Sequence, residues 1–267
     1  MIITKEEKDV ANNLIESFLK NKSKLPYANI GPNNEYLGWV NDFNLTDSNN
    51  KKIYLDLNNS NDLFLLFILA IVWSRSGPWE NSAFFVAYLK VNKKDTIEYW
   101  SDQSNYKKED ESRVYSAKKI SSQLKGIIPR KKISFRQDIF SSVHILARKW
   151  PNILTSLQTS ERKNDFKIFM RYVRSIEGLG VNNRRILIKI TLILRELRCQ
   201  NIYSNISGEL CCVPDARVYE AAKKLEIKIP ITNNIENLTK SSTKIYRLFG
   251  DLYDLPLFAF DDLKKNK

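Results

Sequence analysis

The sequence predicts a mainly α-helical protein, with two helical subdomains flanking a cleft and a small irregular or two-stranded β insertion. Apolar residues recur at helical spacing along most of the 267 residues. Hydrophobic residues make up 43% of the chain, enough to bury a full core. Eight Gly and eight Pro are too few for a turn-dense β-sandwich.

Helical periodicity is clearest in three amphipathic segments. Their apolar positions recur three and four residues apart within Val10–Phe18, Phe166–Val173 and Val218–Leu225. The apolar run Leu63–Trp73 is too short to span a bilayer, so it predicts a helix buried on all sides. Alternation predicts one short strand at Lys52–Leu57 and a weaker second strand at Asp95–Trp100.

The net charge and the few histidines and cysteines narrow the classes of function that the chain can have. The chain has 43 Lys and Arg against 30 Asp and Glu, a net charge of +13. This excess points to a polyanion, most commonly nucleic acid, although a generally solvated basic surface would also explain it. His144 is the single histidine, which excludes a multi-histidine zinc site. Three cysteines without metal-ligand spacing predict a reducing compartment and no disulfide framework.

The segment Asp165–Arg198 carries the most information about binding. An amphipathic helix is expected to end near Ser175 and a second helix to begin near Asn183, with a Gly178-Leu179-Gly180 turn between them. Backbone amides at the start of the second helix would form a phosphate site, to which neighbouring arginines add charge. The candidate binding residues are Gly178, Gly180, Val181, Asn182, Asn183, Arg184 and Arg185. The alternative is an ordinary helical hairpin in which the glycines only turn the chain.

Asp215 is the candidate catalytic carboxylate. It follows Pro214 at the start of the apolar stripe that begins at Val218, so a role as a helix N-cap explains it fully. A carboxylate held there by backbone amides would also have a fixed direction, which stabilising a developing cation requires.

These two segments resemble those of the helix-hairpin-helix DNA glycosylases, of the endonuclease III and 8-oxoguanine glycosylase type. Ile176-Glu177-Gly178-Leu179-Gly180 is similar to the family's hairpin, and Val213-Pro214-Asp215-Ala216-Arg217-Val218 to its catalytic segment. The resemblance covers about Asp165–Leu225 and implies that Asp215 is catalytic and that the hairpin binds double-stranded DNA. Bifunctional members carry a lysine where this chain has Asn182, so the resemblance implies a monofunctional enzyme. No four-cysteine cluster follows, which excludes the iron–sulfur cofactor of endonuclease III relatives.

The implied chemistry needs one carboxylate. Breaking the N-glycosidic bond passes through an oxocarbenium-like sugar that Asp215 would stabilise while it orients a water. A flipped base needs aromatic or apolar walls, and the candidates around the Gly77-Pro78 turn are Trp73, Arg75, Trp79 and Glu80. The alternative is that both tryptophans cap the core.

The leading hypothesis is therefore an intracellular, cytoplasmic or nucleoid-associated DNA-repair N-glycosylase. We expect a monomer that needs no metal or cofactor and no membrane. Two alternatives stay open: a non-catalytic helix-hairpin-helix nucleic-acid-binding protein, and a nucleoside or nucleotide N-glycosidase on the same scaffold. We expect residues 1–130 to form an N-terminal helical region with the β insertion, 131–232 the DNA-binding and catalytic subdomain, and 233–267 C-terminal helices that pack back on the N-terminal region.

Overall fold

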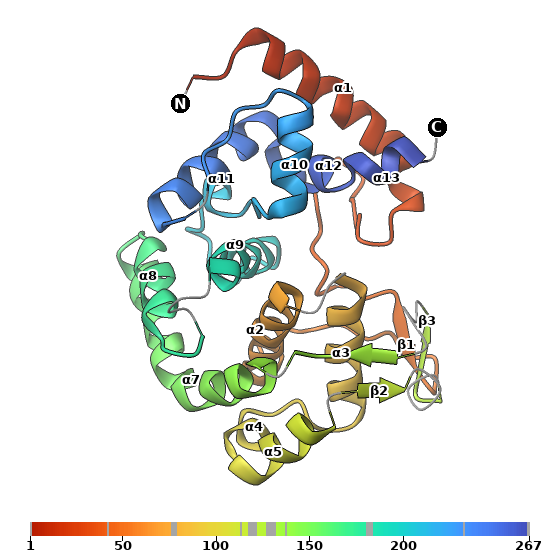
Figure 1. Cartoon of the computed structure of the whole chain (residues 1–267), viewed down its shortest axis with the longest axis vertical. Coiled ribbons are helices and arrows are strands. Elements are labelled where there is room, and N and C mark those ends of the chain that lie inside the picture. The colour runs from red at the N-terminus through yellow and green to blue at the C-terminus, as the bar shows by residue number, and fades with distance from the viewer. Residues whose placement is uncertain are drawn as a thin grey trace. The chain divides into compact units, whose positions relative to one another are not determined.

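The architecture was obtained as a computed structural model. It describes residues 2–41, 43–75, 79–112, 114–116, 122–126, 132–136, 138–179, 184–231 and 233–265. The described chain is mainly α-helical, as the sequence predicts (Figure 1). It forms two compact units, the first from residues 1–38 and 190–267 and the second from Trp39–Lys189.

The first unit is built from helices. Its elements are α1 (Lys5–Asn21), η1 (Lys22–Lys24), the part of α9 (Arg184–Cys199) from Ile190 onward, η2 (Gly208–Leu210), α10 (Ala216–Lys224), α11 (Ile235–Phe249), η3 (Gly250–Leu252), α12 (Leu255–Phe258) and α13 (Phe260–Lys265). α1 packs on α11, α12 and α13, and Figure 1 shows it beside these C-terminal helices. A capping box between Thr4 and Glu7 starts α1.

The Glu7 carboxylate also joins distant parts of the first unit. It is buried, forms an ion pair with the buried Lys244 of α11, and accepts a hydrogen bond from the Lys228 backbone N–H at 3.1 Å. Burial acts to raise the pKa of Glu7, but the hydrogen bonds from Lys244, Lys228 and Thr4 outweigh it and lower that pKa.

The second unit combines helices with two short antiparallel strand pairs. Its elements are β1 (Leu45–Asp47), α2 (Ser60–Arg75), α3 (Trp79–Val91), α4 (Ile97–Ser101), α5 (Gln103–Glu111), β2 (Val114–Ser116), β3 (Leu124–Gly126), β4 (Lys132–Ser134), α7 (Asp138–Arg162), α8 (Lys167–Ser175) and the first turns of α9. β1 pairs with β3 and β2 pairs with β4. α7 packs against α2, α4, α5 and α8.

The helix α2 confirms the prediction of a helix buried on all sides. Every residue from Asp62 to Arg75 is buried. Phe64 and Phe67 meet Trp150 of α7 edge to face, with ring centroids 5.2 and 5.1 Å apart. Among the described residues, no helix has both the length and the apolar character needed to cross a membrane.

The predicted strand at Asp95–Trp100 is wrong, because most of this segment forms α4. Thr96 caps the helix by accepting a hydrogen bond from the Tyr99 N–H at 3.1 Å. Trp100 is fully buried, stacks on Phe140 of α7, and donates its indole N–H to the Lys94 carbonyl at 2.8 Å. The N-cap and the burial of one large ring therefore favour a helix over the weak alternation.

The segment Lys52–Leu57 keeps the predicted alternation without becoming a strand. Ile53, Leu55 and Leu57 are buried while Tyr54 is exposed. Its only bridge among the described residues joins Lys52 to Thr46. Backbone hydrogen bonds from Phe43 to Ile53 and from Leu55 to Val40 hold the segment against the chain before it.

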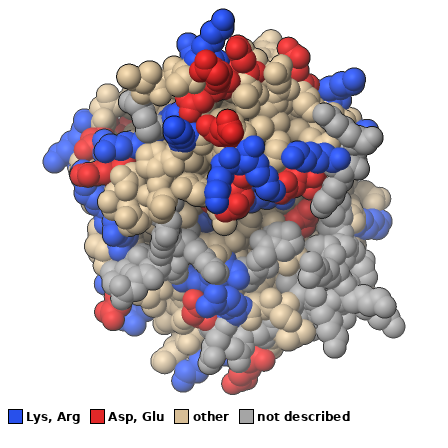
Figure 2. Space-filling view, turned by 45° about the horizontal axis from the view of Figure 1, so that its top comes forward, with Lys and Arg blue, Asp and Glu red and all other residues tan. Residues whose placement is uncertain are grey.

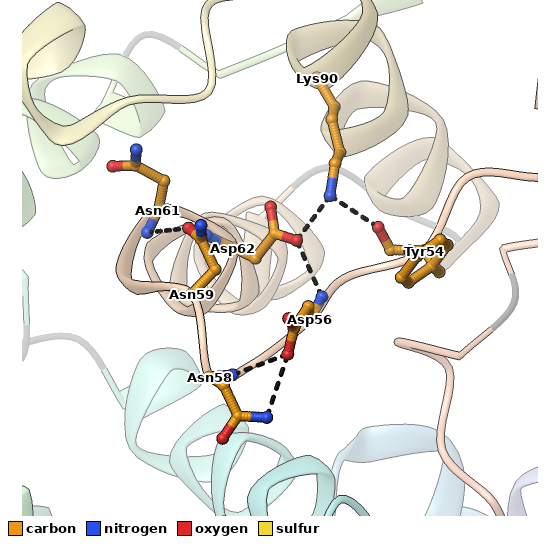
Figure 3. A network of polar contacts seen from close by, with 7 residues as sticks. All are labelled: Tyr54, Asp56, Asn58, Asn59, Asn61, Asp62 and Lys90. Atoms are coloured by element: carbon orange, nitrogen blue, oxygen red, sulfur yellow. Dashed lines mark hydrogen bonds and ion pairs between the residues drawn. The ribbon is translucent and has the colours of Figure 1, made fainter.

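A polar network attaches this segment to α2 and α3 (Figure 3). The Lys90 ammonium of α3 pairs with the Asp62 carboxylate and donates to the Tyr54 carbonyl at 2.8 Å. The same carboxylate oxygen accepts the Asp56 backbone N–H at 2.8 Å. Asn59 caps the start of α2 through the N–H groups of Asn61 and Asp62. One buried carboxylate thus fixes a loop and two helices.

We expect Lys90→Met to lower the free energy of unfolding by about 1–3 kcal/mol, because Asp62 keeps a buried charge without its cation. Urea denaturation followed by circular dichroism measures this. Adding Asp62→Asn should recover part of the loss. The control Lys107→Met, on the exposed face of α5, should change stability by less than about 0.5 kcal/mol. Equal losses in Lys90→Met and Lys107→Met would contradict a supporting role for the network.

Candidate functional site

The turn after α8 requires glycine at residue 178. Gly178 has a φ of +75°, where L-amino acids are strained. A Cβ atom there would also overlap Cδ1 of Ile145 in α7. The turn closes with a hydrogen bond from the Leu179 N–H to the Ile176 carbonyl at 3.2 Å. The positive φ therefore selects glycine, and any larger residue would also have to displace the end of the Ile145 side chain.

The turn is anchored on α7. The Ser142 hydroxyl donates to the Gly178 carbonyl at 2.7 Å, and the Leu179 side chain is buried. α8 ends at Ser175 as expected, and α9 begins at Arg184. The predicted binding residues Gly180, Val181, Asn182 and Asn183 lie outside the described residues, as do the side chains of Arg184 and Arg185.

A groove opens beside this turn. It has a volume of about 610 Å³ and is lined by Ile145, Lys149, Tyr172, Ser175, Ile176, Glu177 and Gly178. Ile145 and Lys149 lie one turn apart on α7, as do Tyr172 and Ile176 across the end of α8, so helical spacing brings them together. The sequence interpretation missed Lys149 and Tyr172, because nothing in the chain indicates that α7 packs on α8.

Four exposed cations lie on α7 and α8, the helices that supply most of the groove lining, and one of them, Lys149, lines the groove itself. Arg148 and Lys149 come from α7, and Arg171 and Arg174 from α8. None of the four forms an ion pair with another residue that the structure describes. On the first unit, several basic side chains do have acidic partners: Arg217–Asp262, Lys224–Asp261, Arg247–Glu209 and Arg198–Asp251.

The net charge is divided unequally between the units. The second unit has 26 Lys and Arg against 15 Asp and Glu, a charge of +11, whereas the first has 17 against 15, a charge of +2. Figure 2 shows Lys and Arg side chains beside Asp and Glu side chains on the face turned to the viewer. The excess positive charge of the chain therefore belongs almost entirely to the second unit.

Asp215 is the N-cap of α10 in the first unit. Its backbone is extended, and its Oδ1 atom accepts hydrogen bonds from the N–H groups of Arg217 and Val218, both at 3.1 Å. The side chain is half-buried. The capping role expected from the sequence is confirmed. The two amides also fix the direction of the carboxylate, as stabilising a cation would require.

The four base-pocket candidates lie in the second unit. Trp73 and Arg75 end α2, and Trp79 and Glu80 begin α3. Trp73 and Trp79 are 8% and 3% exposed, and Trp39 contacts both rings, at centroid distances of 4.7 and 5.4 Å. Asp138 pairs with Arg75 at 2.9 Å. Asp215 belongs to the other unit, so the candidates fall into two separate groups.

The sequence interpretation missed a buried lysine that packs on Trp73. Lys189 of α9 is 4% exposed, and its Nζ atom lies 3.3 Å from the ring centroid of Trp73. A cation on an indole face is a stabilising contact that also lessens the cost of burying the charge. Trp39 and Lys189 lie far apart in sequence, and no motif connects them.

The cysteine thiols are shielded by burial, and the imidazole of His144 packs against its neighbours. Burial raises the pKa of Cys199 to about 12 and raises the pKa of Cys211 and Cys212 as well, which keeps these thiols protonated. His144 stacks on Tyr106 of α5 at 4.9 Å, and its Nδ1 lies 2.7 Å from the Trp100 carbonyl oxygen. Within the described residues, no group of three or more His, Cys, Asp or Glu could hold a metal ion.

Comparisons with known proteins give no further assignment. No family model, curated protein or solved structure matches the chain.

The capping role of Asp215 can be tested by mutation. Asp215→Ala should lower the free energy of unfolding by about 1 kcal/mol, because two amides at the start of α10 lose their acceptor. Asp215→Asn should stay within about 0.5 kcal/mol of the wild type, since asparagine caps helices equally well. Thermal or urea denaturation checks this order. A large loss in Asp215→Asn would mean that the charge, rather than the cap, supports the fold.

Proposed function

We propose that the protein is a monofunctional DNA N-glycosylase that removes a flipped, damaged or modified base. The observation that carries the proposal is the Asp215 carboxylate, half-buried and fixed by two backbone amides at the start of α10. It stands after α8, the Gly178 turn and α9, in the order that the resemblance to helix-hairpin-helix glycosylases implies. We also propose that α8, the Gly178 turn and α9 form a helix-hairpin-helix motif, and that a cleft admits the flipped base.

In the proposed reaction, Asp215 lies near the anomeric carbon of the target nucleotide. The N-glycosidic bond breaks, the base leaves with the bonding electrons and gains a proton, and positive charge develops on the sugar. The carboxylate stabilises that charge and orients a water, whose oxygen bonds to the anomeric carbon and whose proton is lost. Asn182 cannot attack the sugar as a lysine would, so the strand stays intact.

The second unit would hold the DNA. Its charge of +11 and the four exposed cations of α7 and α8 suit the phosphate backbone. The amides of residues 180–183 and the side chains of Arg184 and Arg185 would add contacts at the start of α9. Trp73, Arg75, Trp79 and Glu80 would line the base site. We further propose that the protein acts inside the cell as a monomer, with double-stranded DNA as its partner.

The activity test uses duplex oligonucleotides that each carry one damaged or modified base. The wild type should release a base from at least one duplex, leaving an intact abasic strand that alkali then cleaves. Asp215→Asn should reduce release by at least about a hundredfold, because the transition-state charge loses its stabiliser. The control Glu220→Gln, exposed on the same helix, should retain the wild-type rate.

The same experiment separates the alternatives. Duplex binding with no base release from any substrate would indicate a non-catalytic nucleic-acid-binding protein. Release from free nucleosides that duplex DNA does not inhibit would indicate a nucleosidase. Undiminished release by Asp215→Asn would contradict the proposed mechanism.

A second prediction concerns the binding of phosphates. Combining Lys149→Ala, Arg171→Ala and Arg174→Ala should weaken duplex binding and reduce the slope of log Kd against log salt by about 0.9 for each phosphate that the variant no longer neutralises. Fluorescence anisotropy over a salt series measures both. The matched control combines Lys223→Ala, Lys228→Ala and Lys240→Ala, which remove the same charge from exposed positions of the first unit. Equal changes in both triple variants would refute a specific role for the α7–α8 surface.

A further inference from the structure

The first unit encloses an ion pair between Arg195 and Asp254. Nη1 of Arg195 lies 2.9 Å from Oδ1 of Asp254, and both side chains are no more than 2% exposed. The guanidinium carbon lies 4.9 Å from the ring centroid of Tyr36 and 5.8 Å from that of Tyr253. The Glu196 carboxylate lies 3.6 Å from Nε of the same guanidinium, so two aromatic rings and two carboxylates lie around the cation.

The neighbouring Glu196 completes this cluster. It accepts a hydrogen bond from the Tyr36 hydroxyl at 3.1 Å, and its carboxylate lies so close to Gly38 that a Cβ atom there would meet Oε2 at 2.6 Å. Burial raises the pKa of Tyr36, which keeps the hydroxyl protonated as a donor. These contacts leave the Arg195 side chain little room to move.

Asp254 connects the ion pair to the backbone before Asp215. The Oδ1 atom that pairs with Arg195 also accepts the Val213 N–H at 2.7 Å. The Val213 carbonyl in turn accepts the Asp215 N–H at 2.8 Å. One residue earlier, the Cys212 N–H donates to the Ser242 hydroxyl at 2.9 Å. Successive backbone hydrogen bonds thus hold the chain that leads into α10. The acceptor of one of them is the buried Asp254 carboxylate.

A gain in stability does not by itself account for this arrangement. A buried ion pair usually adds little stability compared with apolar side chains of the same shape, because both charges lose their hydration. What it supplies here is a fixed acceptor for one backbone amide. Burial raises the pKa of Asp254, although the charge of Arg195 and the hydrogen bond from the Val213 N–H act to lower it.

We infer that Arg195 and Asp254 form a positioning pair that sets the direction of the Asp215 carboxylate through the Val213 backbone. The inference rests on the proposed function for its catalytic consequence. Val213 fixes the backbone on one side of Asp215, and the amides of Arg217 and Val218 fix the carboxylate on the other. An error of about 1 Å in such a group is enough to cost about a hundredfold in rate.

The test compares Asp254→Ala with Asp254→Asn, using Lys244→Met as the matched control. Lys244 belongs to another buried ion pair of the same unit, with Glu7, that has no contact with Val213 among the described residues. Asp254→Ala removes the acceptor, whereas Asp254→Asn keeps an oxygen for the Val213 N–H. We expect the single-turnover excision rate to fall by about tenfold to a hundredfold in Asp254→Ala. The fall should be smaller in Asp254→Asn and absent in Lys244→Met, while duplex affinity stays within about twofold in all three.

Amide hydrogen exchange gives a readout that needs no activity. Exchange at Arg217 and Val218 should accelerate in Asp254→Ala beyond the acceleration in Lys244→Met, because the carboxylate that these amides bind has lost its support. Should Asp254→Ala fail to fold, exchange in Asp254→Asn must still exceed that in Lys244→Met. Equal exchange in the Asp254 variants and the control would overturn the inference. A wild type that excises no base would refute the proposed function, while the exchange measurement would still decide the positioning role.

Discussion

Both units depend on the same physical constraint, which is that a charged group in an apolar interior must find compensating partners. In the second unit Asp62 lies at the start of the buried part of α2 and is compensated by Lys90 and a backbone amide. In the first unit Arg195 and Asp254 compensate each other, and Glu7 pairs with Lys244. Each pair joins chain segments that are distant in sequence. Satisfying the buried charge therefore also determines which loops and helices meet.

The charge distribution adds a constraint on function. A net charge of +13 spread evenly would indicate only a soluble basic protein. Nearly all of it belongs to the second unit, where the four exposed cations of α7 and α8 named above have no acidic partners among the described residues. The first unit is close to neutral and contains Asp215. In the proposed function, the second unit would bind the polyanion and the first would supply the reacting carboxylate.

Local features were predictable from the sequence because local interactions determine them. The burial of α2, the cap at Asp215 and the end of α8 all follow from residue types within a few positions. The helix α4 was misassigned because the cap of Thr96 and the burial of Trp100 outweigh a weak alternation. In the candidate site, the capping position of Asp215 and the turn at Gly178 follow from the sequence. Lys149, Lys189 and the Arg195–Asp254 pair were missed as contributors, since their partners come from other elements of the fold.

The surroundings of His144 have a practical value. It is the single histidine of the chain, stacked on Tyr106 of α5 and in contact with the Trp100 carbonyl of α4, while it belongs to α7. Its ring protons therefore give the only imidazole resonances in a nuclear magnetic resonance spectrum, shifted by the current of the tyrosine ring. A native spectroscopic probe thus reports on the packing of three helices without any label.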